Sequence, residues 1–323
     1  MKLSIILPVY NCAAFVREAA DSVLAVPRAD LELIAVDDGS ADGTRAVLDA
    51  LAEADSRVRV FTIPNGGPAN ARNYGLSQAS GDFVGFLDAD DVFRADALEE
   101  QAVRDPACDV LICGFIQTFD GRAEPKLYLP EGADPASLLR RNMLNSVWNK
   151  FYRRSFLTTN QITFPDCRWG EDRLFNFACL RAGARVEVSP EVLYEYRMDG
   201  GVSLVSGYLP DKPEICARVY RESRQICRDE TLTAQLYLKS LLSCCTVLFA
   251  GNCPLSRREK LDYIRRLKYL PETRQATTIP QSGYYGVIRR LFRLGVPRRI
   301  YAFARTVALT QRNFLPVFLR FRR

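Results

Sequence analysis

Short apolar runs alternate with amphipathic segments along the first third of the chain. The runs have the length and residue types of strands buried on both faces, and they lie at 3–9, 32–38, 58–63, 82–88 and 109–119. Helical spacing of apolar positions appears between them, at 13–26, 43–55 and 67–80. This alternation predicts an α/β fold with a doubly wound, mostly parallel sheet flanked by helices. Ligands of such sheets bind beyond the carboxyl ends of the strands.

The pattern becomes less regular in the second third and turns helical near residue 208. The predicted elements are a helix at 134–144 that Asp134 caps, a helix at 169–183, a pair of strands at 185–198 and a helix at 256–267. Ser256 and Glu259 have the spacing of a capping box. We therefore expect a first domain at 1–205 and a mainly helical C-terminal extension at 206–323.

Composition removes several kinds of chemistry. The 323 residues include no histidine, so imidazole cannot serve as metal ligand or general base. Ten cysteines occur without any C-x-x-C pair, which favours reduced, mostly buried thiols in a cytoplasmic protein. The longest apolar stretch, 238–251, contains Lys239 and is shorter than the roughly 20 residues that span a bilayer. We expect it to be a buried helix.

The net charge of +6 is concentrated at the C-terminal end. No Asp or Glu follows Glu272, and arginines alternate with Tyr, Phe, Leu and Ile from residue 284 to the end. Such a tail is either a solvated basic face whose apolar side packs on the domain, or an interfacial segment on an anionic membrane surface. Specific nucleic-acid binding is not expected, because no nucleic-acid module motif is present.

Carboxylates gather where the fourth apolar run ends, in "GDFVGFLDADDVF". Asp88 and Asp90 stand two residues apart, a spacing with which two carboxylates can share one Mg²⁺ or Mn²⁺. The alternatives are a solvated acidic turn, or Asp91 as the cap of the next helix. Asp38 also follows a strand and can accept a hydrogen bond from a base N–H at this edge, while an ordinary Asx turn is the alternative there.

Two further motifs add charge near the same edge. In "NGGPANARNYGL" the glycines allow close approach of the backbone to a ligand, and Arg72 can meet a phosphate or Asp88. The chain has neither G-x-G-x-x-G nor a P-loop, which counts against dinucleotide dehydrogenases and P-loop ATPases. In "WGEDRLFNF", a carboxylate of the adjacent pair Glu171 and Asp172 suits a general base shielded by aromatic residues. The alternative is charge that complements a helix dipole.

Together these motifs resemble those of family 2 glycosyltransferases with the GT-A fold. The resemblance rests on "SIILPVYN", "VDDGSADGT", "NGGPANARNYGL", "GDFVGFLDADD", "VWNKFYRRSFL" and "WGEDRLFNF", and it covers roughly residues 1–205. It implies a nucleotide-binding half at 1–115 and an acceptor half at 116–205. It also implies inverting, metal-dependent transfer of a hexosyl group from a nucleotide sugar, usually a UDP-sugar. The acceptor would be a hydroxyl of a glycan or of a lipid-linked molecule, as in surface polysaccharide synthesis. The enzyme would be cytoplasmic and peripheral to the membrane.

Matching positions imply a role for individual residues. The nucleotide-sugar-binding set comprises Pro8, Val9, Tyr10, Asp38, Asn65, Arg72, Asp88, Arg197 and Ser203. The acceptor-side set comprises Trp148, Asn149, Lys150 and Glu171. Asp90 with Asp88 would hold Mn²⁺ or Mg²⁺ as a D-x-D motif, and Asp172 would be the catalytic base. Many relatives supply a late histidine to the metal, and this chain has none. Two alternatives are a nucleotidyltransferase, whose glycine-rich N-terminal loop is missing, and a non-catalytic scaffold subunit.

Overall fold

The chain consists of two compact units, each described by itself. The first is Met1–Gly200 and the second is Gly201–Arg323, where the sequence predicts a division at 205/206. The computed structural model describes residues 2–28, 30–98, 107–118, 125–198 and 208–321, with side chains as far as residue 310.

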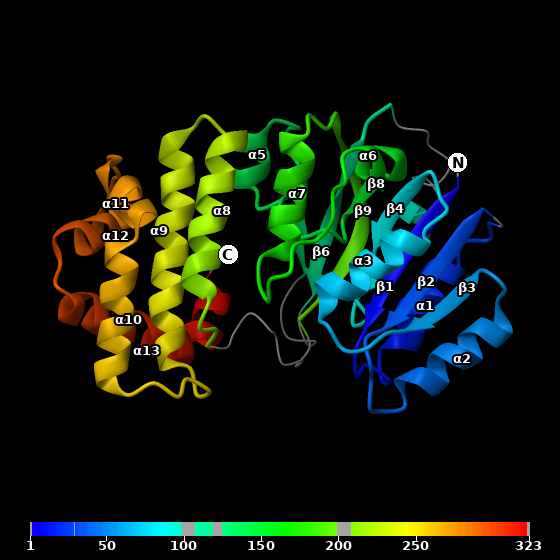
Figure 1. The fold of residues 1–323 in the computed structure, drawn as a ribbon, viewed down its shortest axis with the longest axis horizontal. Helices are drawn as coiled ribbons and strands as arrows, with labels where there is room; N and C mark the ends of the chain where they lie inside the picture. The colour runs from blue at the N-terminus through cyan, green and yellow to red at the C-terminus, as the bar shows by residue number, and fades with distance from the viewer. Residues whose placement is uncertain (1, 29, 99–106, 119–124, 199–207, 322–323) are drawn as a thin grey trace. The chain divides into compact units, whose positions relative to one another are not determined.

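A mixed sheet forms the frame of the first unit (Figure 1). Its strands are β1 Leu3–Val9, β2 Leu31–Asp37, β3 Val58–Thr62, β4 Phe83–Phe86, β5 Val92–Phe93, β6 Val110–Thr118, β7 Lys126–Tyr128, β8 Lys150–Arg153 and β9 Val186–Arg197. Within the described residues their order is β3-β2-β1-β4-β8-β6-β9-β5, with β7 paired to β6. The first four are parallel, whereas β8 is antiparallel to β4 and β6. The predicted α/β doubly wound fold is confirmed, and parallel pairing dominates its N-terminal half.

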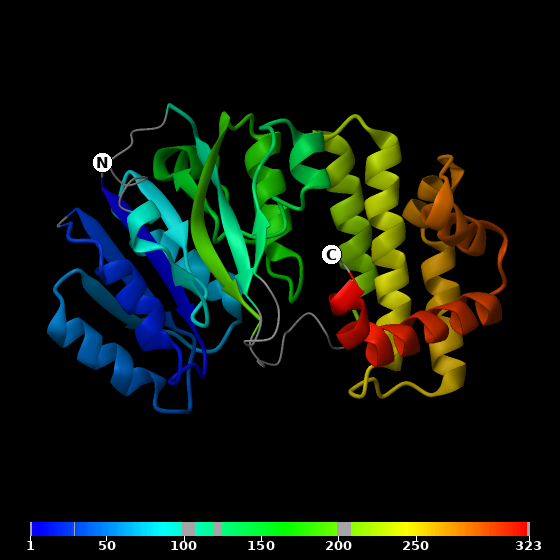
Figure 2. The ribbon, with the colours of Figure 1, turned by 180° about the vertical axis from the view of Figure 1, so that it is seen from behind.

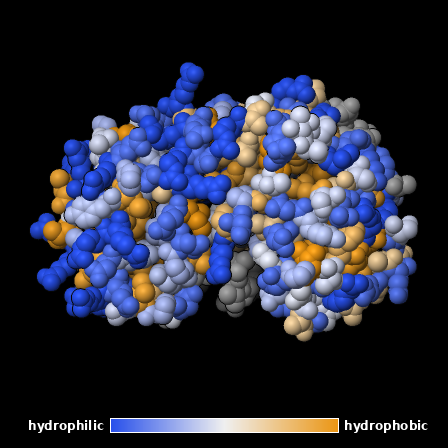
Figure 3. All heavy atoms as spheres, viewed as in Figure 1, coloured by the Kyte–Doolittle hydropathy of each residue, from blue (hydrophilic) through white to orange (hydrophobic). Residues whose placement is uncertain are grey.

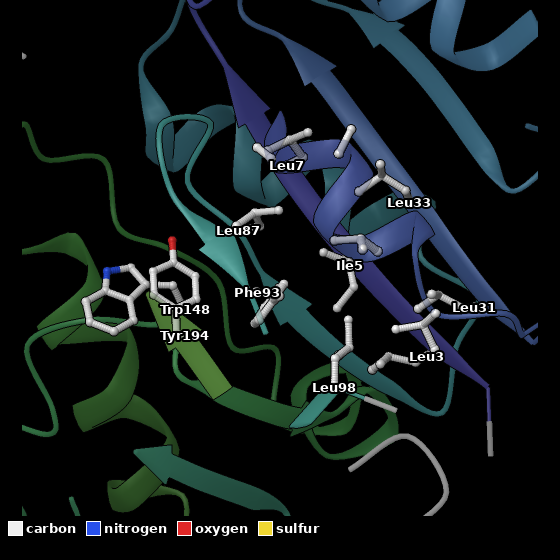
Figure 4. Packing of buried hydrophobic residues seen from close by; sticks show 14 of the residues in the cluster. Leu3, Ile5, Leu7, Leu31, Leu33, Leu87, Phe93, Leu98, Trp148 and Tyr194 are labelled. Atoms are coloured by element: carbon white, nitrogen blue, oxygen red, sulfur yellow. The ribbon is translucent and has the colours of Figure 1, made fainter. Parts of the chain in front are cut away.

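Helices cover both faces of the parallel strands, seen from opposite sides in Figures 1 and 2. They are α1 Val16–Leu24, α2 Thr44–Ala54 and α3 Pro68–Gln78. Successive residues of β1 point to opposite faces. Leu3, Ile5 and Leu7 pack in one cluster with apolar residues of α1 and α2 (Figure 4). Ile6 faces α3, where a Cβ added to Gly75 would lie 2.5 Å from its side chain. The strand is therefore apolar throughout because both of its faces are buried.

Further helices of the first unit are α5 Pro135–Arg140, α6 Arg154–Thr159 and α7 Glu171–Arg181. Asp134 caps α5 as predicted, since its carboxylate accepts a hydrogen bond from the Ser137 N–H at 3.0 Å. α7 follows Gly170, whose φ of +78° lies in the left-handed region that favours glycine. This turn places Glu171 and Asp172 in the first turn of the helix.

The predicted pair of strands at 185–198 is wrong, because the segment is one twelve-residue strand, β9. Pro190 stands at an irregularity where the pairing register with β6 moves from Val188 to Val192. The Glu191 N–H is bonded there to the Ser189 Oγ. A proline lacks the N–H for a ladder bond but is tolerated at a bulge. The strand therefore continues past Pro190.

The second unit is made of helices joined by turns over its described residues. They are α8 Lys212–Ile226, α9 Glu230–Thr246, the 3₁₀ turn η2 Val247–Phe249, α10 Arg257–Tyr269, α11 Pro271–Thr278, α12 Gly283–Leu294 and α13 Pro297–Phe321. α8 and α9 lie side by side in Figure 1. The predicted capping box is present at the start of α10, where Ser256 and Glu259 exchange side-chain-to-backbone hydrogen bonds. The helical extension predicted from the sequence is thus confirmed.

One described helical stretch, Glu230–Phe249, is long and apolar enough to cross a membrane by length and composition alone. In the structure 61% of its apolar window is buried, because α8, α11, α12 and α13 pack against α9. Leu238, Leu241 and Cys245 have no exposed surface. The stretch is therefore the central helix of the second unit, which agrees with the buried helix predicted at 238–251.

The apolar residues of the basic tail are divided between the interior of the second unit and its surface. Ile288, Phe292 and Ile300 are buried, so much of the apolar side of the tail packs within the unit. Leu294 and Val296 are exposed. Figure 3 shows that the viewed face of the second unit is mainly hydrophilic, with isolated hydrophobic residues. The tail thus contributes to packing and also leaves some apolar side chains among its arginines.

Candidate active site

Polar segments follow β1, β2, β3 and β4 at one edge of the sheet, because these four strands are parallel. The ends of β1 and β2 are joined by a hydrogen bond of 2.9 Å from the Asp38 N–H to the Val9 carbonyl. Pro8 is half-buried just before this point. Tyr10 is 51% exposed just after it, so its ring is accessible to a ligand at this edge.

Asp38 is buried and shapes the loop that precedes α3. Its two carboxylate oxygens accept hydrogen bonds of 2.8 Å from the N–H groups of Gly66 and Gly67. Asn65 donates to the Asp38 carbonyl at 3.0 Å. Each carboxylate oxygen retains a second lone pair. Recognition of a uracil N–H by Asp38 therefore stays a prediction, and the structure adds a role in holding the loop.

Arg72 is the residue that brings distant carboxylates together. It lies in the second turn of α3 and is 4% exposed. Its Nη2 donates to Asp88 at 2.8 Å, and its Nη1 donates to Asp172 at 3.0 Å and to Glu171 at 3.3 Å. The guanidinium also lies over the Phe164 ring, 5.5 Å from its centroid. The possibility that Arg72 meets Asp88 is thus realised, and the same side chain reaches the predicted base.

The environment of Asp172 suits a general base. Burial, reinforced by the negative charges of Glu171 and Asp88, raises the pKa of the Asp172 carboxyl well above its usual range. Arg72 and Lys150 oppose that rise without cancelling it. The side chain keeps 15% of its surface exposed, so an acceptor hydroxyl can approach it. A base with a raised pKa holds a proton more firmly once it has taken it.

The three carboxylates of the D-x-D segment have different surroundings. Asp88 is half-buried with 29% side-chain exposure, and Asp90 is exposed. Asp91 is buried and accepts hydrogen bonds of 2.8 Å from the Tyr194 Oη and the Arg197 N–H. Burial and the nearby Asp88 raise the pKa of Asp91 to about 8. Asp91 therefore does not cap a helix and instead joins the D-x-D turn to β9.

The residues present fit a hard divalent cation. Although the Asp90 side chain has exposed surface, desolvation by the surrounding chain and the negative charge of Asp88 raise its pKa. A cation between the two carboxylates would relieve their repulsion. No group of three or more His, Cys, Asp or Glu ligands occurs among the described residues. Mg²⁺ commonly takes one or two carboxylates together with water and substrate phosphates. Asp88 and Asp90 supply that number of protein ligands.

The guanidinium of Arg197 is bonded to α1 and not to Asp88 or Asp90. Its two Nη atoms donate to the carboxylate of Glu18 on α1, at 2.7 Å and 2.6 Å. To contact a diphosphate, as the resemblance implies, the guanidinium would have to leave Glu18. Ser203, predicted to accompany it, lies outside the described residues. Both assignments stay predictions.

The acceptor-side segment is buried beneath the site. Trp148 is 8% exposed, and Asn149 and Lys150 have no exposed surface. Asn149 donates to the Cys113 carbonyl at 2.8 Å, and Lys150 donates to Asn149 and to the Ser146 carbonyl at 2.7 Å. Burial lowers the pKa of Lys150 to about 7, although the nearby Asp172 counteracts it. These residues are therefore part of the interior of the first unit, and their acceptor-side role stays a prediction.

Tyr194 is a site residue that the sequence reasoning missed. Its hydroxyl accepts a hydrogen bond from the Asp88 N–H at 3.1 Å and donates one to Asp91 at 2.8 Å. The ring stacks on Trp148 with centroids 4.4 Å apart, as Figure 4 shows. Tyr196, two residues on and therefore on the same face of the strand, also stacks on Trp148 at 5.5 Å. The spacing of Tyr194 and Tyr196, two residues apart in a strand, was the sequence signal that could have identified Tyr194.

Comparison with known proteins agrees with this geometry. Residues 4–176 match the model of glycosyl transferase family 2, which is more than half of the chain. The protein belongs to this family and is a glycosyltransferase enzyme. A nucleotidyltransferase and a non-catalytic scaffold are therefore no longer required as alternatives.

Particular relatives and structures extend the comparison. The chain is 30% identical to the uncharacterized glycosyltransferase EpsJ of Bacillus subtilis over 68% of this chain and 67% of that protein. It is 30% identical to the poly(ribitol-phosphate) beta-N-acetylglucosaminyltransferase TarS of Staphylococcus aureus over 61% of this chain, but only 35% of TarS. The structure of TarS 1–349 with UDP-GlcNAc has a TM-score of 0.70 at 22% identity, covering 97% of this chain and 92% of that one.

A more distant structure shares the fold, and the structural likeness reaches beyond the sequence resemblance. The mannosyltransferase PcManGT of Pyrobaculum calidifontis, with GDP-Man and Mn²⁺, has a TM-score of 0.52 at 18% identity over 91% of this chain and 87% of that one. The motifs cover only residues 1–205, whereas the likeness to TarS covers 97% of the chain. Helices of the second unit therefore belong to a shared fold.

Proposed function

We propose that the enzyme transfers a sugar from a UDP-sugar to a hydroxyl of a glycan or lipid-linked acceptor, with inversion at the anomeric carbon. The observation that carries the proposal is the bridge made by Arg72 between Asp88 and Asp172. It puts a donor-side carboxylate and a candidate base around one guanidinium. The UDP-GlcNAc in the TarS structure supports a UDP donor, and the names of the relatives support a role in polysaccharide biosynthesis.

The proposed reaction is a single in-line displacement. Asp172 removes the proton of the acceptor hydroxyl while that oxygen attacks the anomeric carbon, and the bond from that carbon to the diphosphate breaks. Arg72 favours the ionised form of the base and orients it through its 3.0 Å contact. Exposed Tyr10 and the Asp38 loop would receive the uridine. Because one displacement inverts the centre, a covalent nucleophile is not needed.

Asp88 and Asp90 would hold the divalent cation, which would supply positive charge next to the departing diphosphate. Asp91 and Tyr194 position this pair, because the Tyr194 hydroxyl joins the Asp88 backbone to Asp91. The Mn²⁺ in the PcManGT structure supports a metal in this fold. The chain's own contribution is thus to hold two carboxylates at a fixed turn.

The test is a calorimetric titration with UDP, with and without Mn²⁺. The wild type should bind UDP more tightly when Mn²⁺ is present, and Asp90→Ala should lose that gain, about tenfold or more. Asp96→Ala is the matched control, because Asp96 is an exposed aspartate whose ion pair with Arg94 spans 3.5 Å. Failure of the wild type to bind UDP with any divalent metal would contradict the proposal.

The basic tail extends the proposal to an anionic membrane surface. Exposed Leu294 and Val296 lie among arginines on α12 and α13, an arrangement that suits an interface rather than a span. Truncation near residue 280 is a poor test, because it would remove buried Ile288 and Phe292. Cosedimentation of the full chain with vesicles at rising salt avoids that damage. Binding that does not weaken with salt would contradict the proposal.

A further inference from the structure

A surface pocket of about 720 Å³ lies between α10 and α13 in the second unit. Its lining residues are Arg257, Arg258, Leu261, Asp262, Arg265 and Arg298. Four guanidinium groups therefore share one cavity with a single carboxylate. Nothing in the proposed sugar transfer uses these residues.

The arginines of the pocket are only partly compensated. Arg265 is ion-paired with Asp262, and Arg257 lies over the Tyr301 ring, 5.9 Å from its centroid. Within the part of the chain that the structure describes, neither Arg258 nor Arg298 has an acidic partner. Residues 273–323 contain no Asp or Glu. The pocket thus carries a net positive charge of three among its lining residues.

Packing fixes the two walls of the pocket. Tyr263 and Ile264 of α10 and Ile300 of α13 are buried, and the two helices contact each other. Lys268 of α10 donates to the Gly295 carbonyl at 2.7 Å, which ties the turn before α13 to α10. The four arginines are exposed, and they project from two helices whose positions are set by this packing.

Three of the arginines also lie where a positive charge is unfavourable. Arg257 and Arg258 are in the first turn of α10, and Arg298 is in the first turn of α13. A helix N-terminus carries partial positive charge, so cations there are unfavourable and anions favourable. An anion in the pocket would offset both the repulsion between arginines and the unfavourable helix ends.

We propose that this arginine pocket binds a phosphate ester group. Guanidinium forks match phosphate oxygens in bidentate geometry, and all four cations here are arginine rather than lysine. The volume lies within the range of small-molecule sites and leaves room for a glycerol or sugar attached to the phosphate. Leu261 is the sole apolar residue in the lining, so the pocket suits a polar head and not an acyl chain.

The phosphate ester can come from a phospholipid headgroup or from a phosphorylated acceptor. The lipid source rests on the membrane attachment proposed above, whereas the acceptor source does not. The two sources share the chemistry that the pocket recognises, and separate probes distinguish them.

The experiment compares three forms of the full-length chain. The pocket variant is Arg258→Gln/Arg298→Gln, and the charge-matched control is Arg293→Gln/Arg305→Gln, because both of its arginines are exposed and outside the pocket lining. Calorimetry measures binding of glycerol 3-phosphate. Cosedimentation measures binding to phosphatidylcholine vesicles with and without phosphatidylglycerol. UDP binding by the wild type is measured separately and reports on the proposed transferase function alone.

We expect wild type and control to bind glycerol 3-phosphate, and the pocket variant to bind it about tenfold or more weakly. Non-specific attraction to anionic vesicles should fall about fivefold per arginine removed, equally in both variants. A larger loss for the pocket variant on phosphatidylglycerol vesicles identifies a lipid headgroup. A loss confined to glycerol 3-phosphate identifies a soluble phosphate ester. Equal behaviour of the two variants with both probes, or no glycerol 3-phosphate binding by the wild type, overturns the proposal.

Discussion

The two units contain opposite imbalances of charge. At the edge of the sheet one buried cation, Arg72, serves three carboxylates. In the pocket of the second unit, four arginines share Asp262 as their only carboxylate. Charges of one sign that lie close together repel each other, so each imbalance favours a ligand of the opposite sign. The comparison indicates a cation at the edge of the sheet and an anion in the helical unit.

At the edge of the sheet, removal of the proposed base Asp172 should have the largest effect on turnover. Asp172→Asn should lower turnover about 10²- to 10⁴-fold, because the amide cannot take the acceptor proton. UDP binding should remain largely intact. Initial rates of sugar transfer and a UDP titration measure the two effects. Glu171→Gln is the control, since Glu171 also contacts Arg72. If this control lost as much turnover with UDP binding intact, the assignment of the base to Asp172 would be contradicted.

Substitution of the bridging cation should have the next largest effect. Arg72→Lys keeps the charge but loses the fork that reaches Asp88 and Asp172 together. We expect turnover to fall about 10- to 100-fold. The acidic limb of the pH–rate profile should move to higher pH. Arg59→Lys is a control with a partly exposed ion pair to Glu32 at 3.1 Å. An unchanged rate for Arg72→Lys would remove the bridge from the mechanism.

The pH dependence of the wild type should be smaller than either effect near neutral pH. The base works as the carboxylate, and burial raises the pKa of Asp172. The rate should therefore rise with pH through that raised pKa and then level off, falling about tenfold per unit below it. Folding raises this pKa, so stability falls as pH rises through the same window. An acidic limb at the ordinary aspartate pKa would contradict the assigned environment.

Loss of a helix cap in the second unit should have the smallest effect. Asp229 accepts a hydrogen bond of 2.9 Å from the Leu232 N–H at the start of α9. Asp229→Ala should lower the free energy of unfolding by about 1 kcal/mol and leave UDP affinity unchanged. Thermal unfolding and a UDP titration measure this. A parallel loss of UDP affinity would show that the two units depend on each other more closely than the comparison assumes.

The sequence determined the local features of this protein. Apolar runs specified the parallel strands β1 to β4 to within one or two residues at most ends, because periodicity reflects which faces are buried. Ser256 with Glu259, and Asp134 before Pro135, specified helix starts, since capping acts within the first turn. The same local logic failed at Pro190, where a bulge that depends on pairing with β6 keeps one strand continuous.

Tertiary structure decided which charges meet. Arg72 contacts Asp172 across 100 residues of sequence, and Tyr194 contacts Asp91 across 103. Arg258 and Arg298 line one pocket only because α10 packs on α13. Periodicity places each residue on a face of its own element. The partners of a buried charge depend instead on which helices and strands pack around it. That arrangement is decided only when the chain folds.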